Sequence, residues 1–377
     1  MLYYFPIEPY EERYTFQLSS KGGWFESALN KFNIPYKRVE GQRLNKEIKI
    51  GSVLDACGRG YWASSQVMKF LELLNNNKIK DQDTVFIEDF WHPGYSALPY
   101  ARHLTGVNFK IYSYVWAQSV DPFDFTYPMR DWMRHFEIGE AKTQDGIFVT
   151  STCLRDSLLY AGIKPKEDIF VVGLPFDSKE VLLRSGREKI EKQSKLAVFT
   201  SRWDREKRPD VFLKIVDEVL EKDPKFEFVI TTSRSKQRSN DESLMGMLKQ
   251  YLRKYPKNLF LKEGISKQEY YGCLKKAQYQ INTADQDFVS FTLLESTTFG
   301  CIPVYPYFLS FPEVFKDHHE FMYQKNNPKD AAKKILDFQG KKNIDVSWIY
   351  KPFDNSIERM FKAMKLISGK YKNLYEK

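Results

Sequence analysis

Short apolar runs alternate with longer amphipathic segments along most of the chain. In the first half, this pattern predicts strands at residues 1–7, 52–56, 83–89, 109–116, 146–151 and 168–173. The segments at 24–33, 62–76, 131–142 and 152–162 have the apolar spacing of helices. Strands that alternate with helices are typical of a parallel sheet covered by helices. The first half is therefore predicted to be one doubly wound α/β domain.

A second series of the same kind follows. It predicts strands at 195–201, 226–233, 258–264, 279–284 and 301–306, and helices at 208–223, 241–255, 266–277 and 290–300. Residues 173–195 interrupt the alternation with glycine, proline and a run of charges, which indicates a linker. We therefore expect an N-terminal domain at 1–180 and a second domain at 181–350, facing each other across a cleft.

The chain ends in a lysine-rich amphipathic segment, residues 353–377. This pattern predicts one helix within a terminal region at 351–377. The helix either packs as the last helix of the second domain or crosses back to brace the first. The total length of 377 residues agrees with two domains, because one hydrophobic core rarely serves so long a chain.

Composition adds that the chain is globular, with 42% hydrophobic and 16% aromatic residues. No apolar run is long enough to span a membrane, and Glu8, Glu11 and Glu12 interrupt the place where a signal peptide has its apolar core. We expect a soluble, cytoplasmic protein without a transmembrane segment. The four cysteines are scattered without the spacing of a zinc site, so reduced core thiols are expected and no metal. The formal net charge of +9 favours partners that carry phosphate.

Two stretches place charged residues directly after predicted strands, where ligands gather in parallel sheets. In "FTSRWDREKRPDVF", Arg202 and Lys207 are five residues apart and suit the oxygens of a diphosphate. The alternative is a solvated charge run that compensates itself. In "DFVSFTLLESTTFGCIPVYP", Asp287 and Glu295 are eight residues apart, Ser290 or Thr292 is placed to cap a helix and Gly300 to end it.

The second stretch also suggests how a ligand binds there. A helix that begins near Ser290, Phe291 and Thr292 offers unpaired N–H groups to an anion, and Glu295 lies about one turn farther on. A carboxylate at that point suits the hydroxyl groups of a ribose or another sugar. We therefore interpret Glu295 as a ligand for hydroxyl groups, and Gly300 as the helix stop that lets the next strand enter the sheet.

Together the two stretches resemble the donor site of GT-B glycosyltransferases, in particular the large retaining class called family 4. The resemblance covers mainly residues 196–306 and rests on Arg202 and Lys207, and on Asp287 and Glu295 followed by Gly300 and a Pro-Val strand. It implies two Rossmann-like domains and a nucleotide-sugar-dependent hexosyl- or pentosyltransferase that needs no metal or other cofactor. Arg202 and Lys207 would then hold the donor diphosphate of a UDP-type sugar, Glu295 the ribose, and Asp287 the transferred sugar.

The same resemblance extends to the first domain in a weaker form. Gly22 and Gly23 look like the glycine-rich turn after the first strand, which lets the backbone approach the donor closely. Family members often present a histidine at the reacting centre, and His92 is the best candidate, with Asp121 as a second catalytic candidate from a nearby type of loop. A histidine beside Trp91 and Pro93 is equally well explained as a loop residue. The chain departs from the family pattern by having Asp287, without following glycines, where glutamate is usual, so the sugar stays open.

The acceptor is suggested by aromatic residues interleaved with arginine in the first domain, and by a basic loop with Arg234, Lys236 and Arg238. In style, though not in a motif, the chain resembles bacteriophage enzymes that glycosylate hydroxymethylated pyrimidines in DNA, which would act in the bacterial host cytoplasm. DNA is therefore the first hypothesis for the acceptor, with the configuration of the sugar retained. The alternatives are a cell-surface polysaccharide, lipopolysaccharide or small-molecule acceptor, and a non-catalytic DNA- or carbohydrate-binding protein.

Overall fold

The computed structural model describes residues 1–11, 13, 15–44, 56–116, 119–124, 126–188, 190–239, 241–316, 318–341 and 344–376. These residues form two compact units. Unit 1 contains Met1–Pro175 and Asn355–Lys377, and unit 2 contains Phe176–Asp354. None of the helices in the described ranges is both long and apolar enough to cross a membrane.

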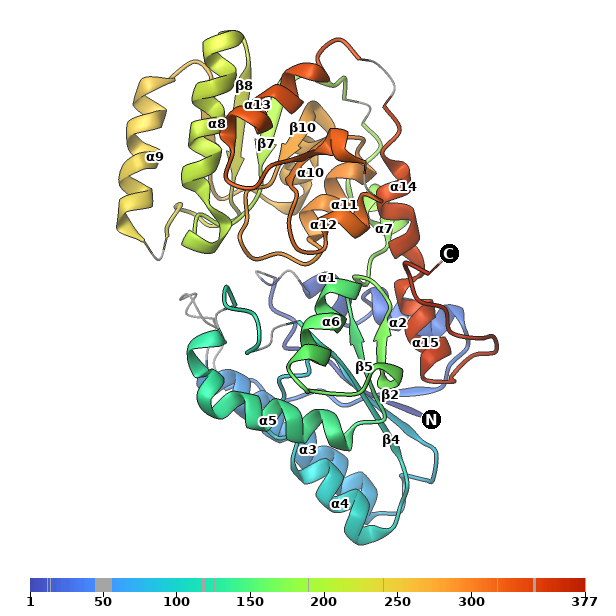
Figure 1. Cartoon of the computed structure of the whole chain (residues 1–377). Coiled ribbons are helices and arrows are strands. Elements are labelled where there is room, and N and C mark those ends of the chain that lie inside the picture. The colour runs from blue at the N-terminus through green and yellow to red at the C-terminus, as the bar shows by residue number, and fades with distance from the viewer. Residues whose placement is uncertain are drawn as a thin grey trace. The chain divides into compact units, whose positions relative to one another are not determined.

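Unit 1 is built on a sheet of six parallel strands in the order β2-β1-β3-β4-β5-β6. The strands are β1 (Leu2–Phe5), β2 (Tyr36–Arg38), β3 (Thr84–Ile87), β4 (Lys110–Tyr114), β5 (Gly146–Val149) and β6 (Ile169–Val171). Its helices are α1 (Phe16–Ser19), α2 (Trp24–Lys31), α3 (Ala56–Asn75), α4 (Ala97–Thr105), α5 (Arg130–Thr143), α6 (Thr152–Tyr160) and α15 (Ser356–Ala363). Figure 1 shows this sheet with its covering helices.

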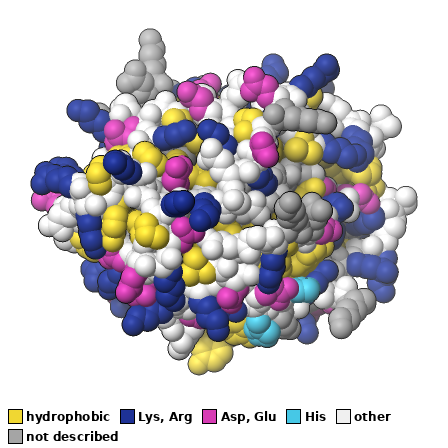
Figure 2. All heavy atoms as spheres, turned by 90° about the horizontal axis from the view of Figure 1, so that it is seen from above, with side chains coloured by type: hydrophobic (Ala, Val, Ile, Leu, Met, Phe, Trp, Pro, Cys, Tyr) yellow, Lys and Arg dark blue, Asp and Glu magenta, His cyan; other side chains and the backbone are white. Residues whose placement is uncertain are grey.

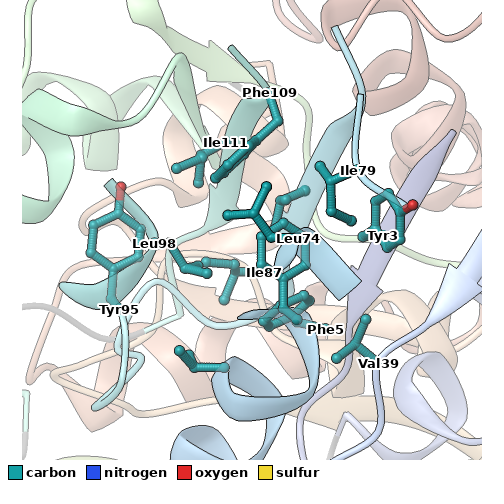
Figure 3. Packing of buried hydrophobic residues seen from close by; sticks show 13 residues of the cluster. Tyr3, Phe5, Val39, Leu74, Ile79, Ile87, Tyr95, Leu98, Phe109 and Ile111 are labelled. Carbon is teal, nitrogen blue, oxygen red and sulfur yellow. The ribbon is translucent and has the colours of Figure 1, made fainter. Parts of the chain in front are cut away.

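The two faces of this sheet are packed by different elements because side chains alternate along each strand. Tyr3 and Phe5 of β1 point into the cluster drawn in Figure 3, where they meet residues of α3 such as Phe70. Tyr4 points the other way and packs on Phe25 of α2. Burying each such large side chain contributes about 1.5 to 3 kcal/mol, so these contacts hold the helices on the sheet.

A buried carboxylate, Glu88, follows β3 at the carboxyl edge of the unit 1 sheet. It accepts hydrogen bonds from the Tyr4 hydroxyl (2.5 Å), the Ser19 hydroxyl and the backbone N–H of Ile7 (3.2 Å). Burial raises the pKa of Glu88 from its ordinary 4.5 to about 7, although these donors oppose the rise. Glu88 thus links β3 by hydrogen bonds to β1, to the segment that follows β1 and to the end of α1.

The C-terminal segment differs from its prediction as one helix over 353–377. Helix α15 ends at Ala363, and the chain then turns through Lys365 (φ +57°) and Gly369 (φ +105°). Phe361 packs edge-on against Phe25 at 5.5 Å. Farther on, the ring of Tyr371 lies against Phe170 at 5.1 Å, and the N–H of Leu374 donates to the carbonyl of Val171 in β6. The segment therefore packs on unit 1 from α2 to β6.

Unit 2 has a second sheet of six parallel strands, in the order β12-β11-β10-β7-β8-β9. The strands are β7 (Gln193–Phe199), β8 (Glu227–Thr231), β9 (Leu259–Lys262), β10 (Ala277–Ile281), β11 (Ile302–Pro306) and β12 (Met322–Tyr323). The helices are α7 (Ser178–Arg184), α8 (Pro209–Lys222), α9 (Glu242–Lys254), α10 (Lys267–Lys276), α11 (Phe291–Thr298), α12 (Phe311–Val314), α13 (Pro328–Asp337) and α14 (Ser347–Tyr350).

The predicted fold class, two doubly wound parallel sheets, is confirmed by these two units. The strand predicted at 52–56 falls almost wholly on residues 52–55, which lie outside the described part of the chain, and Ala56 opens α3. Helix α4 was not predicted. The expectation that all four cysteines are core thiols is wrong for Cys57, which is exposed, whereas Cys273 and Cys301 are buried free thiols.

Candidate functional site

The two charged stretches meet at the carboxyl edge of the unit 2 sheet. Strands β7 and β10 are parallel neighbours with Phe199 opposite Ile281, so the loops that follow them leave the sheet side by side. The Thr283 hydroxyl donates to the carbonyl oxygens of Lys207 (2.8 Å) and Arg208 (2.9 Å). The backbone N–H of Asp285 donates to the carbonyl of Glu206 at 2.8 Å. These bonds fix one loop against the other.

Lys207 and Asp287, predicted from separate stretches, lie next to each other. The Nζ of Lys207 donates to the carbonyl oxygen of Gln286 at 2.5 Å and is 4.0 Å from Oδ2 of Asp287. Asn282 donates to the same Asp287 oxygen from 3.3 Å. The Lys207 side chain is only 14% exposed, so its charge is held at a defined place on the sheet edge.

Arg202 has a different environment from Lys207. Its guanidinium is 2.5 Å from Oε1 of Glu206 and 3.4 Å from Oδ2 of Asp204, and its side chain is 52% exposed. These are the contacts expected of a charge run that compensates itself. A diphosphate that binds Arg202 replaces Glu206 as the partner of the guanidinium. Breaking the exposed ion pair between Arg202 and Glu206 costs little free energy. The loop itself is anchored by buried Trp203, whose indole N–H donates to the carbonyl of Leu244.

Helix α11 begins at the predicted place. Ser290 is its N-cap, with the side-chain oxygen accepting the N–H of Leu293 at 3.2 Å. Thr292 donates to the Ser290 hydroxyl instead of capping the helix, and Phe291 is the first helical residue. Gly300 follows the helix with φ +71°, a left-handed conformation that glycine adopts without strain. The start of the helix directs its first N–H groups to the loop that holds Asp287.

Glu295 lies in the middle of α11 and is only 3% exposed. Its Oε1 accepts hydrogen bonds from Nζ of Lys267 (2.5 Å) and from the Tyr271 hydroxyl (3.2 Å), both on α10. The sequence did not predict these partners, because α10 was interpreted only as an amphipathic helix. One signal was present: a lysine in the first turn of a helix opposes the helix dipole and calls for another explanation.

The two predicted glycines lie in unit 1, just before α2. Gly22 has φ +72°, and its N–H donates to Oε2 of Glu26 at 2.7 Å. A Cβ at Gly23 would lie 2.5 Å from the carbonyl oxygen of Gln17, so only glycine fits there. The turn is therefore tightly packed, and its proposed approach to a donor stays a prediction.

His92 is buried in unit 1, at 2% exposure, instead of lying open at a reacting centre. Its Nε2 is 3.2 Å from Oε1 of Gln66, and its ring lies 5.9 Å from that of Phe5. Burial and the charge of Arg59 lower the pKa of His92 to about 3, so the ring is neutral at physiological pH. This geometry does not favour the catalytic role predicted for His92, because the imidazole faces the core.

Asp121, the other catalytic candidate of the first domain, is also buried. Its Oδ1 accepts the backbone N–H of Phe123 at 2.9 Å, an arrangement that shapes the loop after β4. The structure thus gives Asp121 a structural contact, and its catalytic role stays a prediction.

The basic loop follows β8, beside the loop that carries Arg202. Lys236 and Arg238 are exposed, whereas Arg234 is half-buried and its carbonyl oxygen accepts the N–H of Gly264 at 2.7 Å. Burial, then the charges of Arg238 and Arg202, lower the pKa of Arg234. These arginines therefore lie within electrostatic range of one another, a proximity that the sequence did not predict.

Lys and Arg side chains are dispersed over the face drawn in Figure 2, with Asp and Glu side chains among them. No cluster of three or more His, Cys, Asp or Glu side chains suited to a metal occurs in the described ranges. The net charge alone therefore does not indicate a binding surface. The carboxyl edge of β7, β8 and β10, which the charged loops follow, is the candidate site.

Known proteins are similar to this chain in part of its sequence and in its fold. Residues 184–351 match the family of Glycosyl transferases group 1. No curated protein sequence matches the chain. Among solved structures, a trehalose-6-phosphate synthase has a TM-score of 0.63 at 12% identity, with 97% of this chain and 99% of that chain covered. HepE of Anabaena, in complex with UDP and glucose, has a TM-score of 0.55 at 11% identity, with 97% and 96% covered.

A third similar structure is a variant of TarM from S. aureus, in complex with fondaparinux, α-GlcNAc-glycerol and UDP. It has a TM-score of 0.52 at 19% identity and covers 82% of this chain, which spans 56% of the length of TarM. At these identities the likeness defines the fold, which is the two-unit GT-B fold of glycosyltransferases. Together with the family match, the fold confirms the resemblance to GT-B glycosyltransferases. The donor site drawn from residues 196–306 stays a prediction.

Proposed function

We propose that this enzyme, which carries a group 1 glycosyltransferase domain at residues 184–351, transfers a sugar from a nucleoside diphosphate sugar to a hydroxyl group. The observation that carries the proposal is the meeting of Lys207, Asp287 and the start of α11 at one edge of the unit 2 sheet. A fixed cation and the partial positive charge of a helix N-terminus suit a diphosphate, and a carboxylate beside them suits the hydroxyls of a sugar.

In this proposal each residue has one role. Lys207 and Arg202 bind the diphosphate, Asp287 accepts hydrogen bonds from the transferred sugar, and Glu295 accepts them from the ribose. UDP is the nucleotide we favour, since the solved structures of HepE and TarM contain it. Arg202 exchanges Glu206 for a phosphate oxygen when the donor arrives.

The reaction requires charge stabilisation more than a base from the protein. As the bond between the sugar and the diphosphate breaks, negative charge grows on the leaving phosphate beside Lys207 and the α11 N-terminus, which bind it more strongly than in the ground state. The leaving phosphate then takes the proton of the acceptor hydroxyl, and the new bond forms on the same face of the sugar. Retention of configuration is supported by the trehalose-6-phosphate synthase structure, whose description concerns transfer with retention.

The acceptor that we propose first is a 5-hydroxymethylated pyrimidine in DNA, as in bacteriophage DNA modification in the host cytoplasm. Arg234, Lys236 and Arg238 support it, because none of them forms an ion pair with a carboxylate in the described part of the chain. Cations without such partners suit the phosphates of a nucleic acid. The target base has to leave the duplex to reach the donor.

The second candidate acceptor is a glycan or small molecule. It is supported by the similar structures, since TarM was solved with α-GlcNAc-glycerol and HepE with glucose. In that case the basic loop serves a phosphate or carboxylate of the acceptor instead of a DNA backbone.

One experiment separates these acceptors. The purified protein is incubated with hydroxymethylated-pyrimidine DNA and, one at a time, with a panel of nucleotide sugars, and the nucleosides are then analysed by mass spectrometry. A gain of one sugar mass supports DNA and identifies the sugar class. Slow hydrolysis of one donor without a mass gain supports a glycan or small-molecule acceptor. If the protein neither binds nor hydrolyses any donor, the proposed function is wrong.

A further inference from the structure

Lys267 is the cation nearest to Glu295, and its position is unusual for a helix. It is the first residue of α10, where a positive charge opposes the helix dipole. Its side chain is 48% exposed, yet Nζ lies within 2.5 Å of Oε1 of Glu295. Holding a lysine side chain in one conformation costs up to about 2 kcal/mol, so the pairing with Glu295 must offset that cost.

Two tyrosines support this arrangement. The Nζ of Lys267 lies 4.7 Å from the ring centre of Tyr270 and 4.9 Å from that of Tyr271, within the range of cation–π attraction. The Tyr271 hydroxyl also donates to Oε1 of Glu295. Burial, and then the charge of Glu295, raise the pKa of Tyr270, which keeps its phenol neutral. One ammonium group and two phenol side chains thus surround the carboxylate of Glu295.

The hydrogen bonds from Lys267 and Tyr271 end on the same atom of the Glu295 carboxylate, Oε1. Oε2 accepts neither of these two bonds, although the side chain is almost fully buried. The bonds to Oε1 fix the orientation of the whole carboxylate. They therefore fix the direction in which Oε2 can accept a hydrogen bond from a ligand.

We propose that Lys267 is a positioning residue for donor recognition: it fixes Oε1 of Glu295 and thereby aims Oε2 at a hydroxyl group of the donor ribose. The inference rests on the proposed role of Glu295 in the function given above and deepens it. It follows that the site selects ribonucleotides over deoxyribonucleotides, and that this selection depends on Lys267 although Lys267 does not contact the ribose.

The test measures the affinity of the whole protein for UDP by calorimetry, with GDP and ADP beside it. We expect Lys267→Met to weaken UDP binding about tenfold to a hundredfold, since hydrogen bonds to charged groups are worth that much. Methionine keeps an unbranched side chain over the tyrosine rings, and Lys267→Arg should restore part of the affinity by restoring the charge. Lys276→Met is the matched control, because Lys276 is an exposed lysine at the far end of the same helix.

Two further comparisons separate positioning from general damage. The ratio of affinities for UDP and 2′,3′-dideoxy-UDP should be large in the wild type and shrink towards one in Lys267→Met. In the background of Glu295→Gln, the Lys267→Met change should have little further effect, because the group through which it acts is already altered. This double variant also removes both charges of the ion pair, so it tests the proposal even if the single variant folds poorly.

The possible outcomes distinguish this inference from the proposed function. If UDP binds, Arg202→Ala weakens it, and Lys267→Met leaves both the affinity and the dideoxy ratio unchanged, then the role of Lys267 is wrong and the proposed donor site stands. If the wild type binds none of the three nucleotides, the proposed function is wrong, and the inference is wrong with it.

Discussion

Arg202 and Lys207 are cations five residues apart in one loop, but their surroundings give them different parts in the proposed reaction. Lys207 is largely buried and fixed by Gln286, so its charge is already in place before a donor arrives. Arg202 is half exposed and paired with Glu206, so it has to change partners. Preorganised charge contributes more to catalysis than charge that reorganises during the reaction.

We therefore expect Lys207→Ala to lower kcat/KM for the donor. The expected decrease corresponds to a loss of about 2 to 4 kcal/mol of transition-state stabilisation. Steady-state kinetics with the donor identified by mass spectrometry measure the change. Lys222→Ala is the matched control, since Lys222 is an exposed lysine at the end of α8. Equal rates for the wild type and Lys207→Ala would contradict the donor site.

Glu88 leads to a prediction about pH. Its pKa is raised to about 7 in the folded protein, so the folded state holds its proton more tightly than the unfolded chain does. As pH rises from about 4.5 to about 7, the unfolded chain is favoured progressively, by roughly 3 kcal/mol in total. Glu88→Gln carries no charge at any pH and should lack this loss. Urea titrations of both proteins at about pH 5 and about pH 8 measure it, and identical pH dependence in the two would contradict the assignment.

At the level of residues, the sequence predicted those positions that follow from the order of strands and loops along the chain. Arg202, Lys207, Asp287 and Ser290 follow strands in order, so their meeting at one edge follows from the parallel sheet. Lys267 could not be assigned to Glu295 in this way, because contacts between two helices depend on how the helices pack. The burial of His92 was not predicted for a related reason: its neighbours in sequence do not reveal that the imidazole turns into the core. Its catalytic role stays a prediction.

At the level of elements, helix α11 depends on how it ends as well as how it begins. Gly300 follows it with φ +71°, and a Cβ there would meet only the flexible side chain of Lys192 at 3.6 Å. The space is available, so a substitution is penalised mainly by the left-handed backbone.

Gly300→Ala is expected to destabilise unit 2 by about 1 to 2 kcal/mol. Gly246→Ala provides a control of opposite sign, because Gly246 lies inside α9 where alanine favours the helix and an added Cβ meets no other atom. Thermal unfolding of both variants measures the difference. A Gly300→Ala protein as stable as the wild type would show that α11 does not require the left-handed residue.

Element prediction succeeded where an apolar pattern coincides with burial and failed where the pattern continues past a break in the backbone. Strands such as β1, β3, β5 and β11 are buried on both faces, which gives the short apolar runs that predict them. The residues after α15 keep an amphipathic pattern, but Lys365 adopts a left-handed conformation and ends the helix. Helix α4 was missed because Pro99 suggests a break, although proline is tolerated in the first turn.

At the level of the whole molecule, unit 1 is assembled from two parts of the chain separated by all of unit 2. Residues 355–377 supply Phe361 against Phe25 and Tyr371 against Phe170, and both contacts cover one face of the unit 1 sheet. Side chains of the C-terminal segment therefore pack against apolar side chains of residues 1–175.

A chain that stops after Asp354 should consequently lose stability in unit 1 alone. Removing Ile357, Met360 and Phe361, all buried, forfeits roughly 5 kcal/mol or more of apolar burial. Hydrogen exchange followed by mass spectrometry measures the effect, with faster exchange expected in β1 and β6 and unchanged exchange in β7 and β10. Equal protection of β1 in the full and truncated chains would contradict the structural role of the C-terminal segment.

The same division has a consequence for biosynthesis. Unit 2 is continuous in sequence, so it can fold as soon as it leaves the ribosome. Unit 1 is translated first but completed last, since α2 keeps the face around Phe25 uncovered until α15 has emerged. During that interval the part of unit 1 that precedes unit 2 is the part most in need of protection by chaperones, and a stop codon before α15 leaves unit 1 incomplete.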